Sequence, residues 1–204
     1  GMIDRNLVMP WVSIGLAVFK LDNELLDLMR KSGCEYIAVA IESGNKRVLR
    51  QIINKPVSFD YAKEMVKYAR SLGIYVAANF IVGFPTETWD EIRETLKFAE
   101  EIDVDYAKIF HAVPLPHTRL YELCEQEKAF KGNNRFVWSK GNIETGEFTS
   151  DDLTILRAYE WDRINFTNPE KRAKTAMMMG VSEEELSRTR KDTLKNACKL
   201  IGVN

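Results

Sequence analysis

Two hydrophobic patterns alternate along the first two-thirds of the chain. Short runs of nearly continuous apolar residues predict buried β-strands, and they fall at 11–19, 35–41, 74–82 and 105–113. Between these runs, apolar residues recur every three to four positions, as on one face of an α-helix. Strands that alternate with helices predict an α/β fold whose parallel strands are joined by right-handed crossovers.

Capping residues mark where the helices begin. Asp22 and Ser58 each precede an amphipathic run, and Thr88 with Glu91 has the spacing of a capping box. Glycines such as Gly33 and Gly73 follow the last periodic residue, where helices commonly stop. These signals predict helices at 22–31, 46–52, 58–72, 88–101 and 118–127.

The pattern changes after Phe130. The stretch KGNNRFVWSKGNIETGEF (131–148) is polar and without a period, which indicates a loop or weak extended structure. Helices are then predicted at 149–166, 168–180 and 182–201. The chain therefore divides into an α/β portion, residues 2–130, and an all-helical C-terminal extension, residues 131–204. Within the extension, Trp138 and Trp161 are predicted to anchor it to the sheet, and Met177–Met179 to pack inside a helical interface.

Composition excludes several classes of function. The chain has 204 residues, 45% of them hydrophobic, and a formal net charge of -1, which is typical of a globular protein with a real core. The near-zero charge gives no electrostatic reason to expect nucleic acid or an anionic membrane as partner, and no apolar run approaches the ~20 residues of a membrane span.

Cysteine usage points to a reducing compartment. Cys34, Cys124 and Cys198 are odd in number and far apart, so no disulfide framework is expected and a cytoplasmic location is favoured. No close Cys/Cys or Cys/His spacing is present, and no metal ligands are predicted.

Unusual residues follow three of the predicted strands. The second strand ends in Glu42-Ser43-Gly44, the third in Gly83-Phe84-Pro85, and the fourth runs into a loop that contains Val113-Pro114. Ligands of parallel α/β sheets bind at the carboxyl ends of the strands, which share one edge. We therefore expect these three loops to form one site.

These loops suit a nucleoside-like ligand. The carboxylate of Glu42 can accept two hydrogen bonds from vicinal hydroxyls, and Ser43 adds a donor and an acceptor. Gly83 allows a flat ring to approach the backbone, while Ile81 and Phe84 offer apolar faces. For each of these residues taken singly, a purely structural interpretation also remains open. A glutamate after a strand is often a solvated loop carboxylate, and Gly-Phe-Pro by itself is a turn signal.

Other polar residues near the strand ends have structural interpretations. Glu87 precedes a capped helix and can simply favour its positive end. His111 and His117 are more typical of hydrogen-bonded structural histidines than of bases or ligands.

Three segments occur in order along the chain: GCEYIAVAIESGNKRVLRQIINK, ARSLGIYVAANFIVGFPTETWDEIRETLKFAEEI and VPLPHTRLYE. Their residues and their order resemble the radical S-adenosylmethionine (radical SAM) superfamily, in its cobalamin-domain and methylthiotransferase-like branch. The likeness covers residues 11 to about 123. It implies a partial TIM-type (β/α) barrel of about four parallel strands for residues 2–130.

The resemblance also implies cofactor-binding roles. Glu42 and Ser43 are expected near the ribose or methionine part of S-adenosylmethionine, and Ile81 and Gly83 near its adenine. The remaining cofactor-binding positions that we assign lie in the adjacent turn or at the end of the fourth strand: Phe84, Val113 and Pro114. Thr86 and His117 stand where the family pattern has glycine.

One family feature is absent. Members bind a 4Fe–4S cluster through a CxxxCxxC loop, and this sequence has none. We therefore expect the later part of a radical SAM core plus C-terminal helices. Its full-length parent would use S-adenosylmethionine and the cluster to form a 5′-deoxyadenosyl radical. This chain is expected to have no catalytic residues of its own, to hold neither cofactor tightly and to be inactive alone.

The predicted strand at 11–19 would lie at an edge of the sheet, since the strands that precede it in the family's barrel are missing. An unpaired edge invites pairing with another chain, so a homodimer or domain-swapped assembly is expected there. Two other functions stay open. One is a TIM-type hydrolase or aldolase fragment that uses Glu42, Lys108 or His111 as acid or base. The other is a non-catalytic interaction module that docks through its last helix.

Overall fold

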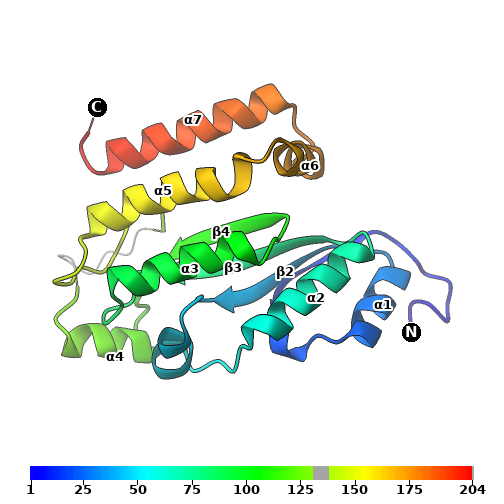
Figure 1. The fold of residues 1–204 in the computed structure, drawn as a ribbon, viewed down its shortest axis with the longest axis horizontal. Coiled ribbons are helices and arrows are strands. Elements are labelled where there is room, and N and C mark those ends of the chain that lie inside the picture. The colour runs from blue at the N-terminus through cyan, green and yellow to red at the C-terminus, as the bar shows by residue number, and fades with distance from the viewer. Residues whose placement is uncertain (131–137, 204) are drawn as a thin grey trace.

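A four-stranded parallel sheet forms the centre of the computed structural model, which describes residues 1–130 and 138–203. Its strands lie in chain order: β1 (Trp11–Ala17), β2 (Cys34–Glu42), β3 (Tyr75–Val82) and β4 (Tyr106–His111). All three neighbouring pairs are parallel, as Figure 1 shows. The predicted α/β fold class is confirmed.

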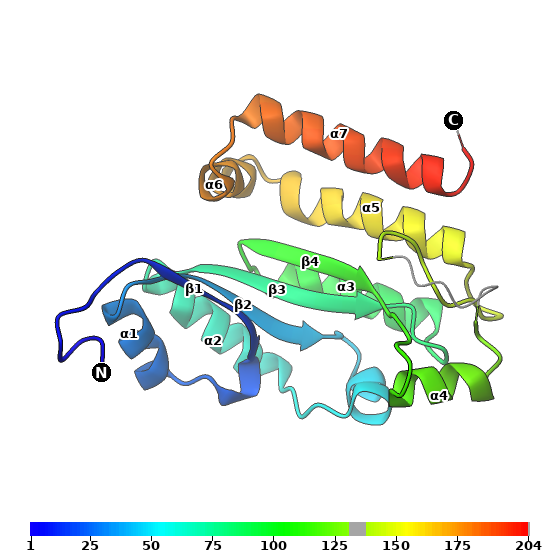
Figure 2. The same cartoon turned by 180° about the vertical axis from the view of Figure 1, so that it is seen from behind.

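Three helices cover one face of the sheet. They are α1 (Asn23–Lys31), α2 (Phe59–Ser71) and α3 (Trp89–Glu101), and Figure 2 shows all three behind the strands. The main core lies between these layers and includes the strand residues Ile37, Val39, Val76, Phe80 and Ile109. Alternate strand residues point to the opposite face, which has no helix across it in Figure 2. We call this surface the open face.

The predicted caps are present. Asp22 accepts a hydrogen bond from the backbone N–H of Leu25, and Ser58 accepts one from Tyr61. Thr88 and Glu91 form a reciprocal capping box at the start of α3. Two short elements differ from the predictions: the 3-10 helix η1 (Val18–Lys20) replaces the end of the first strand, and η2 (Val48–Ile53) is a π-helix.

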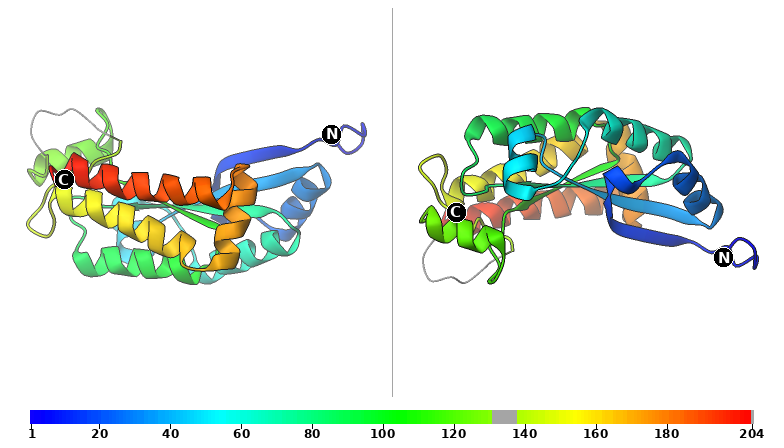
Figure 3. Two further views of the ribbon diagram at one scale, coloured as in Figure 1. Left: turned by 90° about the horizontal axis from the view of Figure 1, so that it is seen from above. Right: turned by 90° about the horizontal axis from the view of Figure 1, so that it is seen from below.

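The C-terminal helices stack over the β4 edge of the sheet. They are α5 (Ser150–Phe166), α6 (Pro169–Met179) and α7 (Glu183–Leu200), preceded by α4 (Arg119–Gln126). Figure 3 shows α5 running along the sheet with α7 beside it. Leu153 and Ile164 of α5 belong to the main core, so α5 is continuous with the α/β portion in its packing.

Asn165 joins α5 to the outer edge of β4. Its amide oxygen accepts a hydrogen bond from the N–H of Ala107, and its amide nitrogen donates to the carbonyl of Ala107, at 2.7 and 2.8 Å. Arg157 donates from Nε to the carbonyl of Ile109 at 3.0 Å. Side chains of α5 thus satisfy backbone groups that another strand would otherwise pair.

The extension differs from the predictions at two places. Trp138 is 73% exposed, and Met177 is 75% exposed with Met178 and Met179 also at the surface, so none of these side chains is buried against residues 1–130 or 138–203. Trp161 does reach the sheet, because its Nε1 donates to the hydroxyl of Tyr106. The proposed division at residues 130 and 131 and much of the predicted loop fall on 131–137, outside the described residues.

No helix in the described part of the chain combines the length and the apolar character that crossing a bilayer requires.

Candidate functional site at the carboxyl edge of the sheet

The three strand-end loops lie at one edge of the sheet. Val82 pairs with His111, and the N–H of Ala112 donates to the carbonyl of Val82 at 2.9 Å. Glu42 lies opposite Phe80 after an irregularity in the β2–β3 register. Since the strands are parallel, the loops that begin after Glu42, Val82 and His111 leave the sheet on the same side.

Glu42 is the last residue of β2 and has an unusual backbone. Its φ of 74° lies in the left-handed region, which is uncommon for a residue with a side chain. Its carboxylate forms an ion pair with the ammonium group of Lys55, which follows η2. The predicted acceptor for ribose hydroxyls is therefore at the edge, with a cation already beside it.

Ser43 and Gly44 turn toward helix α3. The hydroxyl of Ser43 shares a hydrogen bond of 3.0 Å with the hydroxyl of Thr95, and it accepts one from the N–H of Asn45. A Cβ on Gly44 would lie 2.6 Å from the Cβ of Phe98. This dipeptide docks the end of β2 onto α3, and Ser43 is fully buried there.

A buried glutamate holds the turn after β3. One carboxylate oxygen of Glu87 accepts hydrogen bonds from the N–H groups of Gly83 and Phe84, at 2.7 and 3.1 Å. The other oxygen is buried without a hydrogen-bond partner among the described residues. Burial raises the pKa of Glu87 to about 7, against the lowering effect of these two amides. Glu87 therefore binds the strand-end turn, rather than merely favouring the helix that follows.

Gly83 has a backbone that only glycine adopts readily, with a φ of 85°. A Cβ on this residue would lie 2.4 Å from a methyl group of Leu153, so α5 approaches the turn closely. Phe84 is buried in the main core. Both residues shape the turn, and the predicted roles of Gly83 near adenine and of Phe84 as an apolar face for the ligand stay predictions.

Ile81 and Asn79 point to the open face of β3. Ile81 is half-buried and pairs with Phe110, while Asn79 lies between Ala40 and Lys108 in the register. The amide oxygen of Asn79 is buried and has no hydrogen-bond partner among the described residues. We did not select Asn79 from the sequence. The available signal was a lone amide inside the apolar run AANFIV.

His111 ends β4 and faces α5. Its Nε2 donates to the carbonyl of Leu153 at 3.1 Å, and burial lowers its pKa to about 4. The ring is thus neutral at pH 7 and fixed in the fold, as expected for a structural histidine. Val113 is half-buried and Pro114 buried in the loop that follows.

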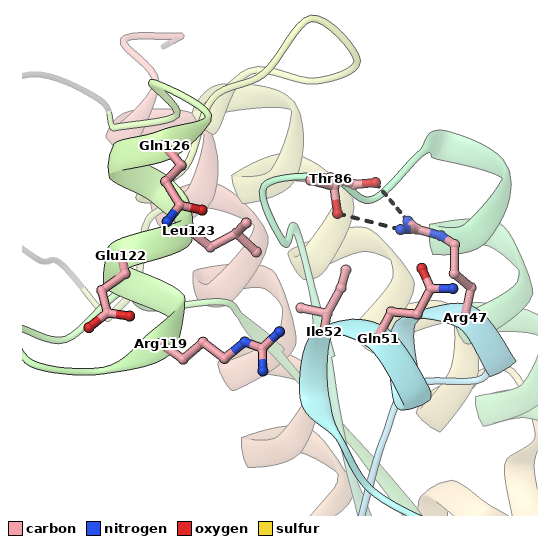
Figure 4. Close-up of a pocket in the computed structure, with 8 residues that line it drawn as sticks. All are labelled: Arg47, Gln51, Ile52, Thr86, Arg119, Glu122, Leu123 and Gln126. Carbon is pink, nitrogen blue, oxygen red and sulfur yellow. Dashed lines mark hydrogen bonds between the residues drawn. The ribbon is translucent and has the colours of Figure 1, made fainter.

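A pocket of about 450 Å³ opens at the same edge, between η2, the turn after β3 and α4 (Figure 4). Its walls include Gln51, Thr86 and Arg119. None of the residues predicted to face a nucleoside lines it. The edge therefore carries two separate surfaces, the open face near Ile81 and this pocket.

The residues at the edge fit the nucleoside part of S-adenosylmethionine. The half-buried Ile81 offers apolar surface on the side of the sheet where the amide oxygen of Asn79 lacks a partner among the described residues, and Val113 follows the neighbouring strand at the same edge. An orphaned acceptor of this kind suits a ligand that donates hydrogen bonds.

The residues do not fit a 4Fe–4S cluster. Cys34 begins β2 at the opposite edge of the sheet, Cys124 is buried in α4, and Cys198 lies in α7. Burial raises the pKa of Cys34, and it raises that of Cys124 to about 11, which disfavours the thiolates that clusters need. No group of three or more candidate metal ligands occurs in residues 1–130 and 138–203.

Comparison with known proteins gives a consistent result. Residues 8–99 match the model of the Radical SAM superfamily. The chain is 38% identical over 127 residues to cytidylyl-2-hydroxyethylphosphonate methyltransferase of Streptomyces wedmorensis, covering 59% of this chain and 24% of that protein. It is 39% identical over 130 residues to an uncharacterised methyltransferase of Pyrococcus horikoshii, covering 63% and 28%. The chain thus spans about a quarter of the length of these curated relatives.

Solved structures support the fold. Coproporphyrinogen III oxidase (HemN) from Escherichia coli, a radical SAM enzyme, superposes with a TM-score of 0.53 at 18% identity. The superposition covers 74% of this chain and 31% of the enzyme. At this identity the likeness concerns the fold alone, and it agrees with the predicted partial TIM-type barrel.

Proposed function

Because this chain belongs to the radical SAM superfamily over residues 8–99, we propose that it forms the nucleoside-facing part of a radical SAM core. The observation that carries this proposal is the meeting of three strand-end loops at one edge, beside the open face of the sheet. In this role, Ile81 and Val113 contact the base, and Glu42 and Asn79 accept hydrogen bonds from polar groups of the ligand. Ser43, Gly83, Phe84 and Pro114 keep the loops in place.

The parent enzyme is proposed to use S-adenosylmethionine and a 4Fe–4S cluster. When bound, S-adenosylmethionine supplies the group that is transferred or the nucleoside from which a radical forms. Methyl transfer is the reaction class favoured by the names of two relatives, each a methyltransferase. The cysteines of this chain lie too far apart to ligate a cluster, so the proposal assigns cluster binding to other residues and no independent catalysis to this chain.

The contacts described above do not favour the two rival functions. An acid–base role for His111 conflicts with its buried, hydrogen-bonded ring. A free docking helix at the C-terminus conflicts with the packing of α7 on α5, where Arg190 forms two hydrogen bonds with the carboxylate of Asp162. The ammonium group of Lys108 lies above the ring of Tyr36, and this contact by itself does not indicate a nucleophilic lysine.

Equilibrium dialysis with S-adenosylmethionine tests the nucleoside-facing surface. We expect weak, saturable binding that Ile81→Glu reduces at least tenfold, because a charge then occupies the apolar contact. Leu28→Glu, on the exposed side of α1, is the matched control and should bind as the wild type does. Absence of saturable binding at millimolar ligand, or equal binding by Ile81→Glu, would refute the proposal.

Reconstitution with iron and sulfide tests the proposal that this chain does not itself bind the 4Fe–4S cluster. The chain should show no stoichiometric 4Fe–4S absorption, because no three thiolates meet. A stable cluster at one per chain would overturn this assignment.

A further inference from the structure

The pocket in Figure 4 has the features of a separate ligand site. Its volume of about 450 Å³ is in the range of small-molecule sites. Ile52 and Leu123 supply apolar surface, and Gln51 and Gln126 supply amide groups from opposite walls. The pocket thus combines apolar walls with a few convergent polar groups, the usual composition of a small-molecule site.

Arg119 is the uncommitted cation of this pocket. Its side chain makes no hydrogen bond or ion pair with residues 1–130 or 138–203. In Figure 4 its guanidinium points toward Ile52, while the carboxylate of the neighbouring Glu122 points away. An arginine presents a planar fork of N–H donors that matches carboxylate and phosphate groups.

Arg47, by contrast, is committed to the fold. Its guanidinium donates to both carboxylate oxygens of Glu91, at 2.5 and 2.6 Å, and to the carbonyl of Thr86 at 2.7 Å. It therefore shapes the wall and leaves the recognition of an anion to Arg119.

The position of Arg119 in its helix offers no structural benefit. It is the first residue of α4, directly after the cap Thr118. A cation at a helix N-terminus opposes the helix dipole, so this side chain slightly disfavours the helix that carries it. An anion in the pocket would remove this penalty and pair the guanidinium.

We propose that this pocket binds a small molecule that carries a carboxylate or phosphate group. The oxyanion pairs with the guanidinium of Arg119, and the side-chain amides of Gln51 and Gln126 hydrogen-bond to polar atoms near it. The apolar body of the ligand packs between Ile52 and Leu123. The site is distinct from the nucleoside-facing surface, since the two sets of residues do not overlap.

Three small probes test the proposal: phenyl phosphate, benzoate and phenol. Each is titrated into the ¹⁵N-labelled chain, and amide and arginine Nε–H shifts are followed by NMR. Saturable shifts at Arg119, Gln51 and Gln126 with phenyl phosphate or benzoate are expected, and the stronger of the two identifies the preferred oxyanion. Equal binding of neutral phenol, shifts confined to other residues, or no saturation by about 10 mM would overturn the proposal.

Arg119→Gln isolates the proposed contact, with the exposed Arg188→Gln of α7 as the matched control. Affinity for the better probe should fall at least tenfold in Arg119→Gln and stay unchanged in Arg188→Gln. The melting temperature of Arg119→Gln should be unchanged or higher, which separates loss of binding from loss of folding. Retained affinity in Arg119→Gln refutes the proposal. Ile81→Glu should bind the probe normally, so this test is independent of the nucleoside-facing surface.

Discussion

Glu87 shows how one buried group determines the shape of the strand-end turn. It is 1% exposed, and its carboxylate accepts hydrogen bonds from the first two backbone N–H groups of the turn. Its pKa is raised from 4.5 to about 7 by burial. The folded protein therefore holds a proton at pH 5 to 6 that the unfolded chain releases.

This shift predicts a pH-dependent stability with a defined sign. The pKa of Glu87 is higher in the folded protein than in the unfolded chain. The stability that protonated Glu87 contributes is therefore present at low pH and is lost as pH rises through about 7. Between pH 5 and pH 8 the free energy of unfolding should fall by about 2–3 kcal/mol from this residue. Glu87→Gln, which cannot ionise, should lack this fall in urea unfolding. The exposed Glu125→Gln is the control, and a shared pH profile of wild type and Glu87→Gln would contradict the assignment.

Helix α5 covers the outer edge of β4, and Asn165 makes two of the hydrogen bonds that join the helix to this edge. It is fully buried and makes two hydrogen bonds to the backbone of Ala107 and one to the carbonyl of Trp161. Its removal leaves buried backbone groups without partners, and each costs about 1–3 kcal/mol.

Asn165→Ala should therefore lower the free energy of unfolding by about 2–4 kcal/mol, as measured by urea denaturation. The exposed Asn196→Ala on α7 should change it by less than about 0.5 kcal/mol. A loss below about 1 kcal/mol for Asn165→Ala would mean that water replaces the amide, and that α5 does not act as an edge cap.

The elements were predictable because their signals are local. The caps at Ser58, Thr88 and Ser182 lie within three residues of the amides that they bind, so the sequence alone shows where those helices begin. The sequence predicted a short helix at 46–52 but did not show that η2 is a π-helix. A π-helix has one more residue in each hydrogen-bonded turn than an α-helix, and this difference hardly changes the apolar pattern of a six-residue element.

The site was predictable in position but less so in detail. Parallel topology alone places the loops after Glu42 and Val82 at one edge. The direction of Ser43, however, depends on Thr95, 52 residues away, and the surroundings of Gly83 depend on Leu153 of α5. Such long-range contacts leave no pattern in a single sequence. The nearly continuous apolar run of β2 predicted a buried strand, and Ala38 and Ala40 are indeed buried, although no helix crosses their face of the sheet in Figure 2.

The molecule as a whole has edges of opposite character. The outer edge of β4 is capped by α5, whereas among the described residues β1 pairs with β2 alone. Val12 and Ile14 of β1 are 65% and 75% exposed. An open apolar edge strand favours pairing with another chain, and we propose that two copies associate through β1.

Light scattering coupled to size exclusion checks this assembly. The wild-type chain should elute as a dimer at about 100 µM, and Ile14→Lys should shift it to monomer, because charges on edge strands oppose pairing. Ile3→Lys, exposed outside the sheet, is the control and should remain dimeric. A monodisperse wild-type monomer at high concentration would contradict the proposal.

The decisive measurement is an NMR titration of 5′-deoxyadenosine into the chain labelled at isoleucine and valine methyl groups. If the carboxyl edge and the open face form a nucleoside-facing surface, the methyl signals of Ile81 and Val113 shift saturably together, while those of core residues behind the sheet, such as Val66, stay in place. Shifts of the core or of the far edge near Ile74, with Ile81 and Val113 unmoved, would contradict that conclusion.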